Sequence, residues 1–316
     1  MRAMSFVLAV WIVSAGSAVG REIHVSNTAG DDHYNGRQQQ ALPDGSGPVQ
    51  TIGRALQLAQ AGDRIVLAKT DQPYRESISL VGNRHGGYYQ QPLTIQGNGA
   101  ILDGSAPVPP ESWQHCRDAV FRFRPPHMSH QQLFLDDVPV TRVVAESLAH
   151  SPPKLDPLQW SLHGGHIYFC VEPNKLPQDY RLSYAHLPTG VTLLHVRGVA
   201  ILDLTVQGFQ LDGINLCNSA RDVYLAGVVV RGNGRSGVTV GGASRAEIDG
   251  SIIGNNGRAQ VLTLPYSETV LRNCDVYANT APAWVDRGGR FWIAQRELEG
   301  GLDEDVKAET ESRNAP

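Results

Sequence analysis

The second half of the chain alternates short apolar runs with small polar corners. The stretches "VVVRGNGRSGVTV" (228–240) and "SIIGNNGRAQVLTL" (251–264) share one shape, in which a corner with Asn, Gly and Arg separates two apolar runs. The runs are short and rich in β-branched residues, as is typical of strands. This pattern predicts strands joined by tight corners.

The pattern also recurs with a fixed period. Val206, Val230, Ile253 and Val276 follow one another in steps of 24, 23 and 23 residues. Two more columns keep these steps: Ile201, Leu225, Ile248, Leu271 and Ile214, Val238, Val261, Trp284, the latter preceded by Val191. The regular Leu and Asn spacing of a leucine-rich repeat is absent. Short strands with this period predict a parallel β-helix, whose coils stack at about 4.8 Å.

One residue of each corner has an architectural explanation. Asn233, Asn256 and Asn279 fall in a single column, 23 residues apart each time. Asn tolerates the left-handed backbone that a tight corner needs, and stacked Asn side chains can hydrogen-bond along a ladder. We interpret this column as a structural ladder.

The first hundred residues predict the beginning of the same solenoid. The segment 50–68 predicts a short helix with Thr51 as its N-cap and its end at Gly62, followed by the strand "RIVLA". "ESISL" (76–80), "PLTIQG" (92–97) and "AILDG" (100–104) predict strands of the first coils. A helix in this position could close the open end of a solenoid, which needs a cap.

These segments carry a family resemblance. "IHVSNTAGDDHYNG", "TIGRALQLA", "AGDRIVLA" and "LTIQGNGAILDG", with the middle segments "QQLFLDDVPVTRV" and "WSLHGGHIYFCVEP", resemble secreted right-handed parallel β-helix proteins of the pectate-lyase-like superfamily. The resemblance covers most of residues 22–285. It implies an all-β fold, a right-handed parallel β-helix (solenoid) with an N-terminal capping helix and an inserted β-rich subdomain. It does not specify an activity, because the superfamily includes lyases, hydrolases, epimerases and non-catalytic surface proteins.

The expected organisation has five parts. Residues 1–20 read as a cleaved signal peptide, with Arg2, an apolar stretch and small residues before the cleavage site. Residues 21–104 form the N-terminal cap and first coils, 105–190 the Pro-rich insert that breaks the period, and 191–290 the regular coils. The acidic tail 291–316 is expected to be disordered. The mature chain is therefore expected to be secreted, or to lie in the periplasm or cell envelope, without a membrane span.

Composition agrees with a β-rich extracellular protein. The 316 residues include 33 Gly and 19 Pro, only 18% are charged, and the net charge of −4 gives no attraction to nucleic acid. The four cysteines, Cys116, Cys170, Cys217 and Cys274, allow three disulfide pairings among which the sequence does not choose. None forms a Cys-x-x-Cys pair, so we expect no zinc or redox site.

The candidate chemistry centres on arginines. Arg235 and Arg258 are 23 residues apart, two positions past the Asn column, and Arg231 is close by. Stacked guanidinium groups repel unless an anion lies between them, so a uronate or sulfate of an acidic polysaccharide is one expectation and pairing with nearby carboxylates is the other. Members of the resembled superfamily that cut acidic polysaccharides neutralise the uronate carboxylate with a cation or an Arg and remove its C5 proton with Lys or Arg, which is compatible with the first expectation and leaves the second open.

Other candidates are weaker. Asp212, in "QLDGINL", lies where β-helix polygalacturonases carry an Asp-Gly site, but the paired Asp residues and the Gly-His-Gly motif that should follow are missing. We retain Asp212 and Arg235 as catalytic candidates, and Arg231, Arg235 and Arg258 as substrate-binding candidates. Calcium is conceivable near Asp31, Asp32, Asp44 and Asp71, although no loop motif supports it. No metal site is predicted.

Three functions remain open on this basis. The first is a polysaccharide lyase or glycoside hydrolase, the second a non-catalytic carbohydrate-binding protein, and the third a structural solenoid. The side chains that line one cleft with Arg235 and Arg258 discriminate between the first two. A Lys, His or carboxylate from the insert favours the enzyme, whereas aromatic and amide groups alone favour binding.

Overall fold

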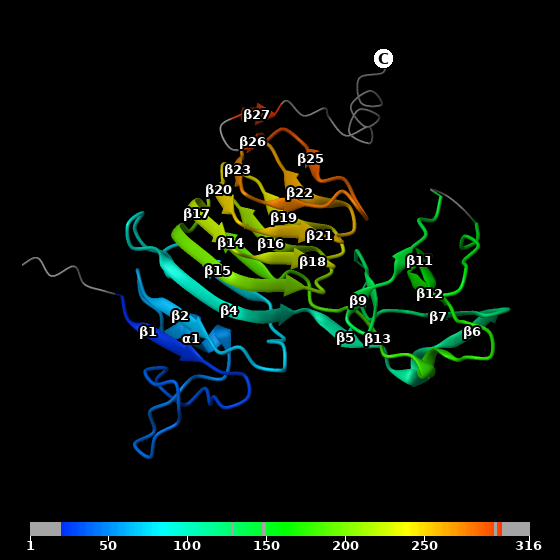
Figure 1. Cartoon of the computed structure of the whole chain (residues 1–316), viewed down its shortest axis with the longest axis horizontal. Helices are drawn as coiled ribbons and strands as arrows, with labels where there is room; N and C mark the ends of the chain where they lie inside the picture. The colour runs from blue at the N-terminus through cyan, green and yellow to red at the C-terminus, as the bar shows by residue number, and fades with distance from the viewer. Residues whose placement is uncertain (1–19, 128, 147–149, 294–295, 299–316) are drawn as a thin grey trace, which may run out of the picture.

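The computed structural model describes residues 20–127, 129–146, 150–293 and 296–298. The expected signal peptide therefore lies outside the described residues except for Gly20. Within this part of the chain, no helix is long and apolar enough to cross a membrane. Two stacks of parallel strands form the body of the molecule, and the insert projects from one side of it (Figure 1).

Two parallel sheets enclose the main core. The first runs in the order β1 (Glu22–Val25), β2 (Arg64–Leu67), β4 (Leu93–Asp103), β15 (Arg197–Gln207), β17 (Arg221–Ala226), β20 (Arg245–Asp249), β23 (Glu268–Arg272), β26 (Arg290–Ile293) and β27 (Arg296–Leu298). Its bent extension adds β18 (Val229–Arg231), β21 (Ile252–Gly254) and β24 (Asp275–Val276). The second sheet runs in the order β25 (Trp284–Asp286), β22 (Ala259–Thr263), β19 (Ser236–Val240), β16 (Asp212–Cys217), β14 (Val191–Leu194) and β3 (Ile78–Val81).

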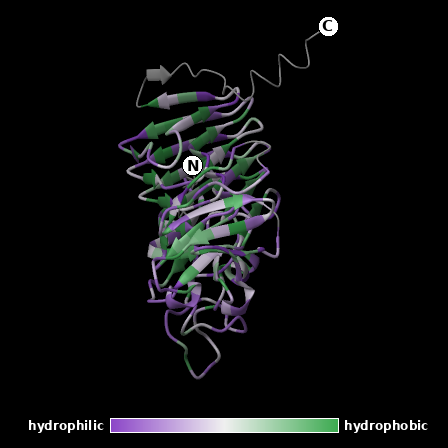
Figure 2. Cartoon of the chain, turned by 90° about the vertical axis from the view of Figure 1, so that its right-hand side faces the viewer, coloured by the Kyte–Doolittle hydropathy of each residue, from purple (hydrophilic) through white to green (hydrophobic). Residues whose placement is uncertain are grey.

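The predicted register is confirmed in all three columns. Ile201 pairs with Leu225, Leu225 with Ile248, and Ile248 with Leu271. The other columns pair in the same way: Val206, Val230, Ile253, Val276 and Val191, Ile214, Val238, Val261, Trp284. These side chains point inward and are buried, except for the partly buried Val276 and Trp284. Apolar residues thus concentrate in the stacked strands and polar ones in the turns (Figure 2).

The N-terminal elements differ in detail from the prediction. Thr51 caps the helix α1 (Ile52–Leu58) as expected, because its side chain accepts a hydrogen bond from the Arg54 N–H. The predicted end at Gly62 is wrong, since Ala59 is already extended and the carboxylate of Asp63 accepts the Gln60 N–H at 2.8 Å, which holds these residues in a turn. Buried residues of α1 join the main core. That α1 closes the solenoid end stays a prediction.

Two predicted strands form one strand in the structure. The predicted strands 92–97 and 100–104 merge into β4, which pairs with β15 through Leu93–Gln96 and again through Ala100–Asp103. Between these two paired stretches the chain bends at the left-handed residues Asn98 and Gly99, and the register shifts without the strand leaving the sheet. Asp203 takes the same left-handed conformation in β15.

The insert is rich in strands and leaves the coils between β4 and β14. One sheet contains β10 (Thr141–Arg142), β11 (Gln159–His163), β12 (His166–Cys170), β7 (Val120–Phe123) and β6 (Gln114–Arg117). The other contains β5 (Ser105–Pro107), β13 (Leu182–Ala185), β8 (Leu133–Leu135) and β9 (Val138–Pro139). Two short 3₁₀ helices complete it, η1 (Pro110–Ser112) and η2 (Pro177–Asp179). The antiparallel pair β5 and β13 lies at its base, and its own core surrounds Trp160 and Phe169.

The end of the chain is ordered further than we predicted. β26 and β27 pair antiparallel, so residues 290–293 and 296–298 form strands where a disordered tail was expected. Pairing is favourable here because β26 also continues the parallel ladder from β23. Residues 299–316 lie outside the described residues. The four cysteines are free thiols in this structure, with Cys116 and Cys170 in the insert sheet and Cys217 and Cys274 in the coils.

Candidate functional site at the junction of insert and coils

The corner between β18 and β19 is the place where the insert touches the coils. A Cβ on Gly234 would lie 3.1 Å from the Cβ of His130 and 2.4 Å from the carbonyl oxygen of Gln210. A Cβ on Gly232 would lie 2.8 Å from the ring of Phe134. The two glycines that flank Asn233 thus allow the insert to approach the backbone of the corner. We call the region where His130 and Arg142 of the insert lie near Asp212, Arg235 and Arg258 of the coils the junction site.

Asp212 is the buried anchor of this site. Its side chain has no exposed surface, and it accepts hydrogen bonds from Arg235 Nε at 2.9 Å, Ser236 Oγ at 2.8 Å and Asn215 Nδ2 at 2.8 Å. Arg235 Nη2 donates to its second oxygen, which completes a bidentate pair. The hydrogen bonds from Arg235, Ser236 and Asn215 occupy both carboxylate oxygens. In this geometry Asp212 positions Arg235 and does not itself reach a substrate.

The two stacked arginines therefore have different surroundings. Arg235 lies one coil beyond Asp212 and pairs with it, and this pairing raises the pKa of its guanidinium. Arg258 lies one coil further and is exposed. Within the described part of the chain, no carboxylate lies at ion-pair distance from Arg258. The expectation that the stacked arginines pair with nearby carboxylates thus holds for Arg235, while Arg258 keeps an accessible positive charge.

Arg231 belongs to a different network. Its Nε donates to Gln207 Oε1 at 3.0 Å, and Gln207 Nε2 donates to the buried carboxylate of Asp103 at 3.1 Å. These residues occupy one column of the bent extension of the first sheet, at the base of the insert. The structure thus ties Arg231 to the point where the insert leaves the coils.

The insert contributes two groups that the sequence did not single out. Arg142, on β10, lies with its guanidinium carbon 5.2 Å from the ring centroid of Trp160, and its buried Nε has no hydrogen-bond partner. Burial and the charge of Arg258 lower its pKa, but an arginine keeps its charge. His130 is half-buried. Burial, Arg258 and Arg235 lower its pKa to about 4, against an opposing effect of Asp212.

The junction site is thus positive and contains a neutral histidine. Three guanidinium groups face one carboxylate that is already paired, so an anion is the ligand that the charge favours. At neutral pH His130 carries no proton on one ring nitrogen and can accept one. No sequence signal identified His130 or Arg142, because the insert has no repeat that predicts which of its residues face the coils.

The three Asn residues of the column do not form one continuous ladder of hydrogen bonds. Asn233 and Asn256 are buried, and Asn256 Oδ1 accepts both the backbone N–H and the side-chain Nδ2 of Asn233 at 3.0 Å. Asn256 continues to Gln260 Oε1 at 2.8 Å. Asn279 is exposed and bonds Asn255 instead, at 2.8 Å. The buried pair fixes the corner that carries Arg235 and Arg258.

Three of the carboxylates suggested for calcium have protein partners. Asp31 bonds His33, and Asp32 accepts the side chain of Thr51 and two backbone N–H groups beside the helix. Asp44 bonds Ser46. Among the described residues, no group of three or more His, Cys, Asp or Glu side chains could hold a metal ion. We therefore derive no step through a metal.

Comparisons with known proteins identify the fold. The family described as right handed beta helix region matches residues 189–294. A solved glycoside hydrolase is 11% identical with a TM-score of 0.58, over 85% of this chain and 74% of that chain. A rhamnogalacturonan lyase (10% identity, TM-score 0.31, 86% of this chain, 62% of that chain) and a pectin methylesterase (12%, 0.30, 86%, 66%) are more distant.

The likeness at these identities concerns architecture alone. The sequence comparison found no match among curated proteins. The matched region coincides with the coils whose register the apolar columns predicted. Residues 189–294 match the right-handed β-helix family model, and the fold of the described chain is a right-handed parallel β-helix.

Proposed function

We propose that the junction site binds an acidic polysaccharide, with Arg258 as the group that contacts a uronate carboxylate or a sulfate. The observation that carries this proposal is an exposed arginine without a carboxylate partner in the described chain, next to two more guanidinium groups. A planar guanidinium matches the two oxygens of a carboxylate. Arg235, held by Asp212, and Arg142, held over Trp160, add positive charge from fixed positions.

His130 is the candidate base for a β-elimination at this site. A base removes the C5 proton of the uronate, the bond from C4 to the glycosidic oxygen breaks, and a C4=C5 double bond forms. The leaving oxygen takes a proton from water. Arg258 would neutralise the uronate carboxylate, which makes the C5 proton more acidic. His130 is unprotonated at neutral pH, as a base must be, and the role requires that substrate binding brings its nitrogen within reach of the C5 proton.

Hydrolysis has less support at this site. Glycosidases use two carboxyl groups that face the scissile bond. At the junction site Asp212 is buried and bonded through both oxygens. The half-buried position of His130 does favour a second candidate, which is binding of the same polymer without cleavage.

The experiment that separates these candidates follows the unsaturated product. Purified protein is incubated with polygalacturonate, alginate and hyaluronate, and the ultraviolet absorbance of the unsaturated uronate is recorded. A lyase gives a rising signal on one polymer that His130→Ala abolishes, while its binding to that polymer remains. A flat signal with retained binding establishes the non-catalytic candidate, and absence of both activity and binding contradicts the proposal.

We also propose that the protein works outside the cytoplasm, where such polymers occur. Residues 1–20 have the composition of a signal peptide. Expression with and without this segment, followed by fractionation and N-terminal sequencing of the exported chain, tests the proposal. Export that does not depend on residues 1–20 would contradict it.

A further inference from the structure

A shallow groove crosses the outer face of the first sheet, away from the junction site. Its volume is 520 Å³, within the range of about 300–1,000 Å³ of small-molecule sites. It crosses β15, β17, β20 and β23, and the three inter-strand steps of about 4.8 Å give it a length of ~14 Å. A short oligosaccharide has this length.

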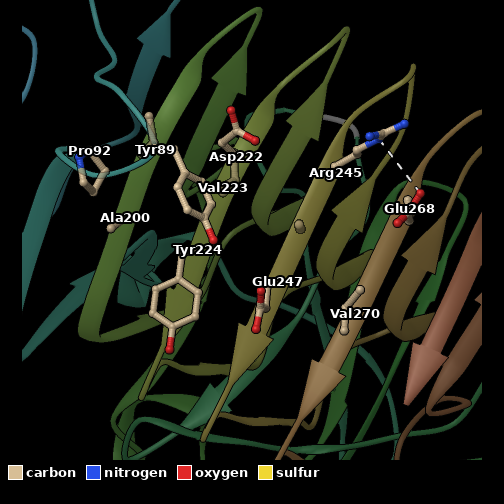
Figure 3. A pocket seen from close by; sticks show the side chains of 12 residues that line it. Tyr89, Pro92, Ala200, Asp222, Val223, Tyr224, Arg245, Glu247, Glu268 and Val270 are labelled. Atoms are coloured by element: carbon tan, nitrogen blue, oxygen red, sulfur yellow. Dashed lines mark ion pairs between the residues drawn. The ribbon is translucent and has the colours of Figure 1, made fainter. Parts of the chain in front are cut away.

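Two tyrosines form one end of the groove. Tyr224, on β17, follows Ala200 in an outward-facing column, and the small alanine leaves the hollow beside its ring. Tyr89, 80% exposed, stands above them on a turn that is closed by two backbone hydrogen bonds of 3.0 Å between Tyr88 and Gln91. Figure 3 shows Tyr89 beside Asp222 and Tyr224 at this end.

The turn that carries Tyr89 is fixed to the sheet. Gly87 donates its N–H to the carbonyl of Arg197 at 2.9 Å. A Cβ on Gly198 would lie 2.7 Å from the carbonyl carbon of Gly87, so the turn lies directly on β15. The position of Tyr89 over the groove therefore follows from backbone contacts and does not depend on its exposed side chain.

Carboxylates line the rest of the groove, and each has an arginine partner. Asp222 Oδ2 accepts from Arg197 Nε at 2.6 Å, and Glu247 Oε1 accepts from Arg272 Nε at 2.6 Å. Glu268 lies 3.9 Å from Arg245 and 3.7 Å from Arg290. The first of these Glu268 pairs is drawn in Figure 3. The face is thus locally neutral, in contrast to the junction site.

These acidic side chains nevertheless remain accessible. Asp222, Glu247 and Glu268 expose 29%, 44% and 32% of their side chains. An ionised carboxylate has about four lone-pair sites, so an arginine partner leaves acceptors for hydroxyl groups. A charged ligand would compete with the existing ion pairs, whereas a neutral polyol can use the remaining acceptors.

We infer that this groove binds a neutral polysaccharide, with its pyranose rings against Tyr89 and Tyr224 and its hydroxyl groups on Asp222, Glu247 and Glu268. Tyrosine offers an apolar face and a polar tip, which suits the C–H face and the hydroxyl rim of a sugar ring. The groove and the junction site lie on different walls of the solenoid. The protein would then hold a neutral and an acidic chain by separate surfaces.

The test is isothermal titration calorimetry of the full chain with cellohexaose, xylohexaose and mannohexaose. We expect at least one of them to bind, and the double variant Tyr89→Ala/Tyr224→Ala to weaken that binding at least tenfold. Tyr224→Phe keeps the ring and should keep most of the affinity, which separates stacking from a folding defect. Tyr266→Ala is the matched control, because Tyr266 is 87% exposed and does not line the groove.

Three results would overturn the inference. The first is that no neutral hexasaccharide binds at millimolar concentration. The second is that the double variant binds as the unmodified protein does. The third is that chitosan hexamer binds more tightly through the same tyrosines, since the groove would then select a cation. Arg258→Ala should leave binding of neutral sugars unchanged, so this test is independent of the junction site.

Discussion

Arg235 holds both carboxylate oxygens of Asp212, which lies 23 residues earlier and one coil away. The sequence suggested that stacked arginines need an anion between them. The structure supplies a protein anion for Arg235 and leaves Arg258, on the following coil, exposed. The two arginines therefore differ: Arg235 is held by a buried carboxylate, and Arg258 is accessible to a ligand.

Removal of the Asp212 carboxylate should destabilise the protein strongly. Asp212→Ala leaves Arg235, Ser236 and Asn215 without their acceptor, and breaking a buried ion pair costs about 3–5 kcal/mol. Urea unfolding measures the loss. Arg197→Ala is the control, because the pair that it removes with Asp222 is exposed and such pairs contribute about 0–1 kcal/mol. Equal losses in the two variants would contradict the role of Asp212 as a buried anchor.

Stability should fall in acid because of His130. An unfolded histidine titrates near 6.5, whereas in the folded protein its pKa is about 4. Between these values the unfolded chain binds a proton that the folded chain does not, so the free energy of unfolding decreases as the pH falls from 6.5 towards 4.

The variant His130→Asn isolates this contribution. From about pH 7 to about pH 5, the free energy of unfolding should fall less in His130→Asn than in the unmodified protein, by about 1 kcal/mol after allowance for solvent screening. Urea unfolding at the two pH values gives the comparison, and other histidines cancel because both proteins contain them. A difference that does not change with pH would mean that His130 titrates as in water.

Removal of a buried Asn of the column should destabilise the protein more than removal of the exposed one. Asn256→Ala removes the oxygen that accepts two N–H groups of the buried Asn233, and each unsatisfied donor costs about 1–3 kcal/mol. We expect a total loss of about 2–4 kcal/mol in thermal or urea unfolding. Asn279→Ala, in the same column but exposed, should lose less than about 1 kcal/mol. Similar losses at both positions would show that burial does not distinguish them.

The sequence predicted the coils well because their pattern repeats. Each apolar column has several members, so one irregular residue such as Trp284 does not hide the register. The length of α1 and the continuity of β4 were missed, because the hydrogen bond from Gln60 to the Asp63 side chain decides the first and the left-handed residues Asn98 and Gly99 the second. The pairing of β26 with β27 was also missed, because both strands were assigned to the acidic tail that follows them.

Only the site residues that belong to the repeating coils could be predicted from the sequence. Arg235 and Arg258 could be placed together from their spacing, and the structure brings both near His130. Which arginine pairs with Asp212 depends on side-chain direction at the start of β16, which a period does not encode. His130 and Arg142 reach the coils through the tertiary packing of the insert against Gly232 and Gly234.

The most direct measurement of the central claim is calorimetric titration of an oligogalacturonate into the unmodified protein, Arg258→Ala and Arg221→Ala. Arg221 is also exposed but lies on the first sheet, so its variant removes the same charge from another wall. We predict that Arg258→Ala weakens binding at least tenfold, about 1.4 kcal/mol, while Arg221→Ala changes it little. Equal weakening by both variants, or unchanged binding in Arg258→Ala, would contradict an acidic-polysaccharide site at the junction of insert and coils.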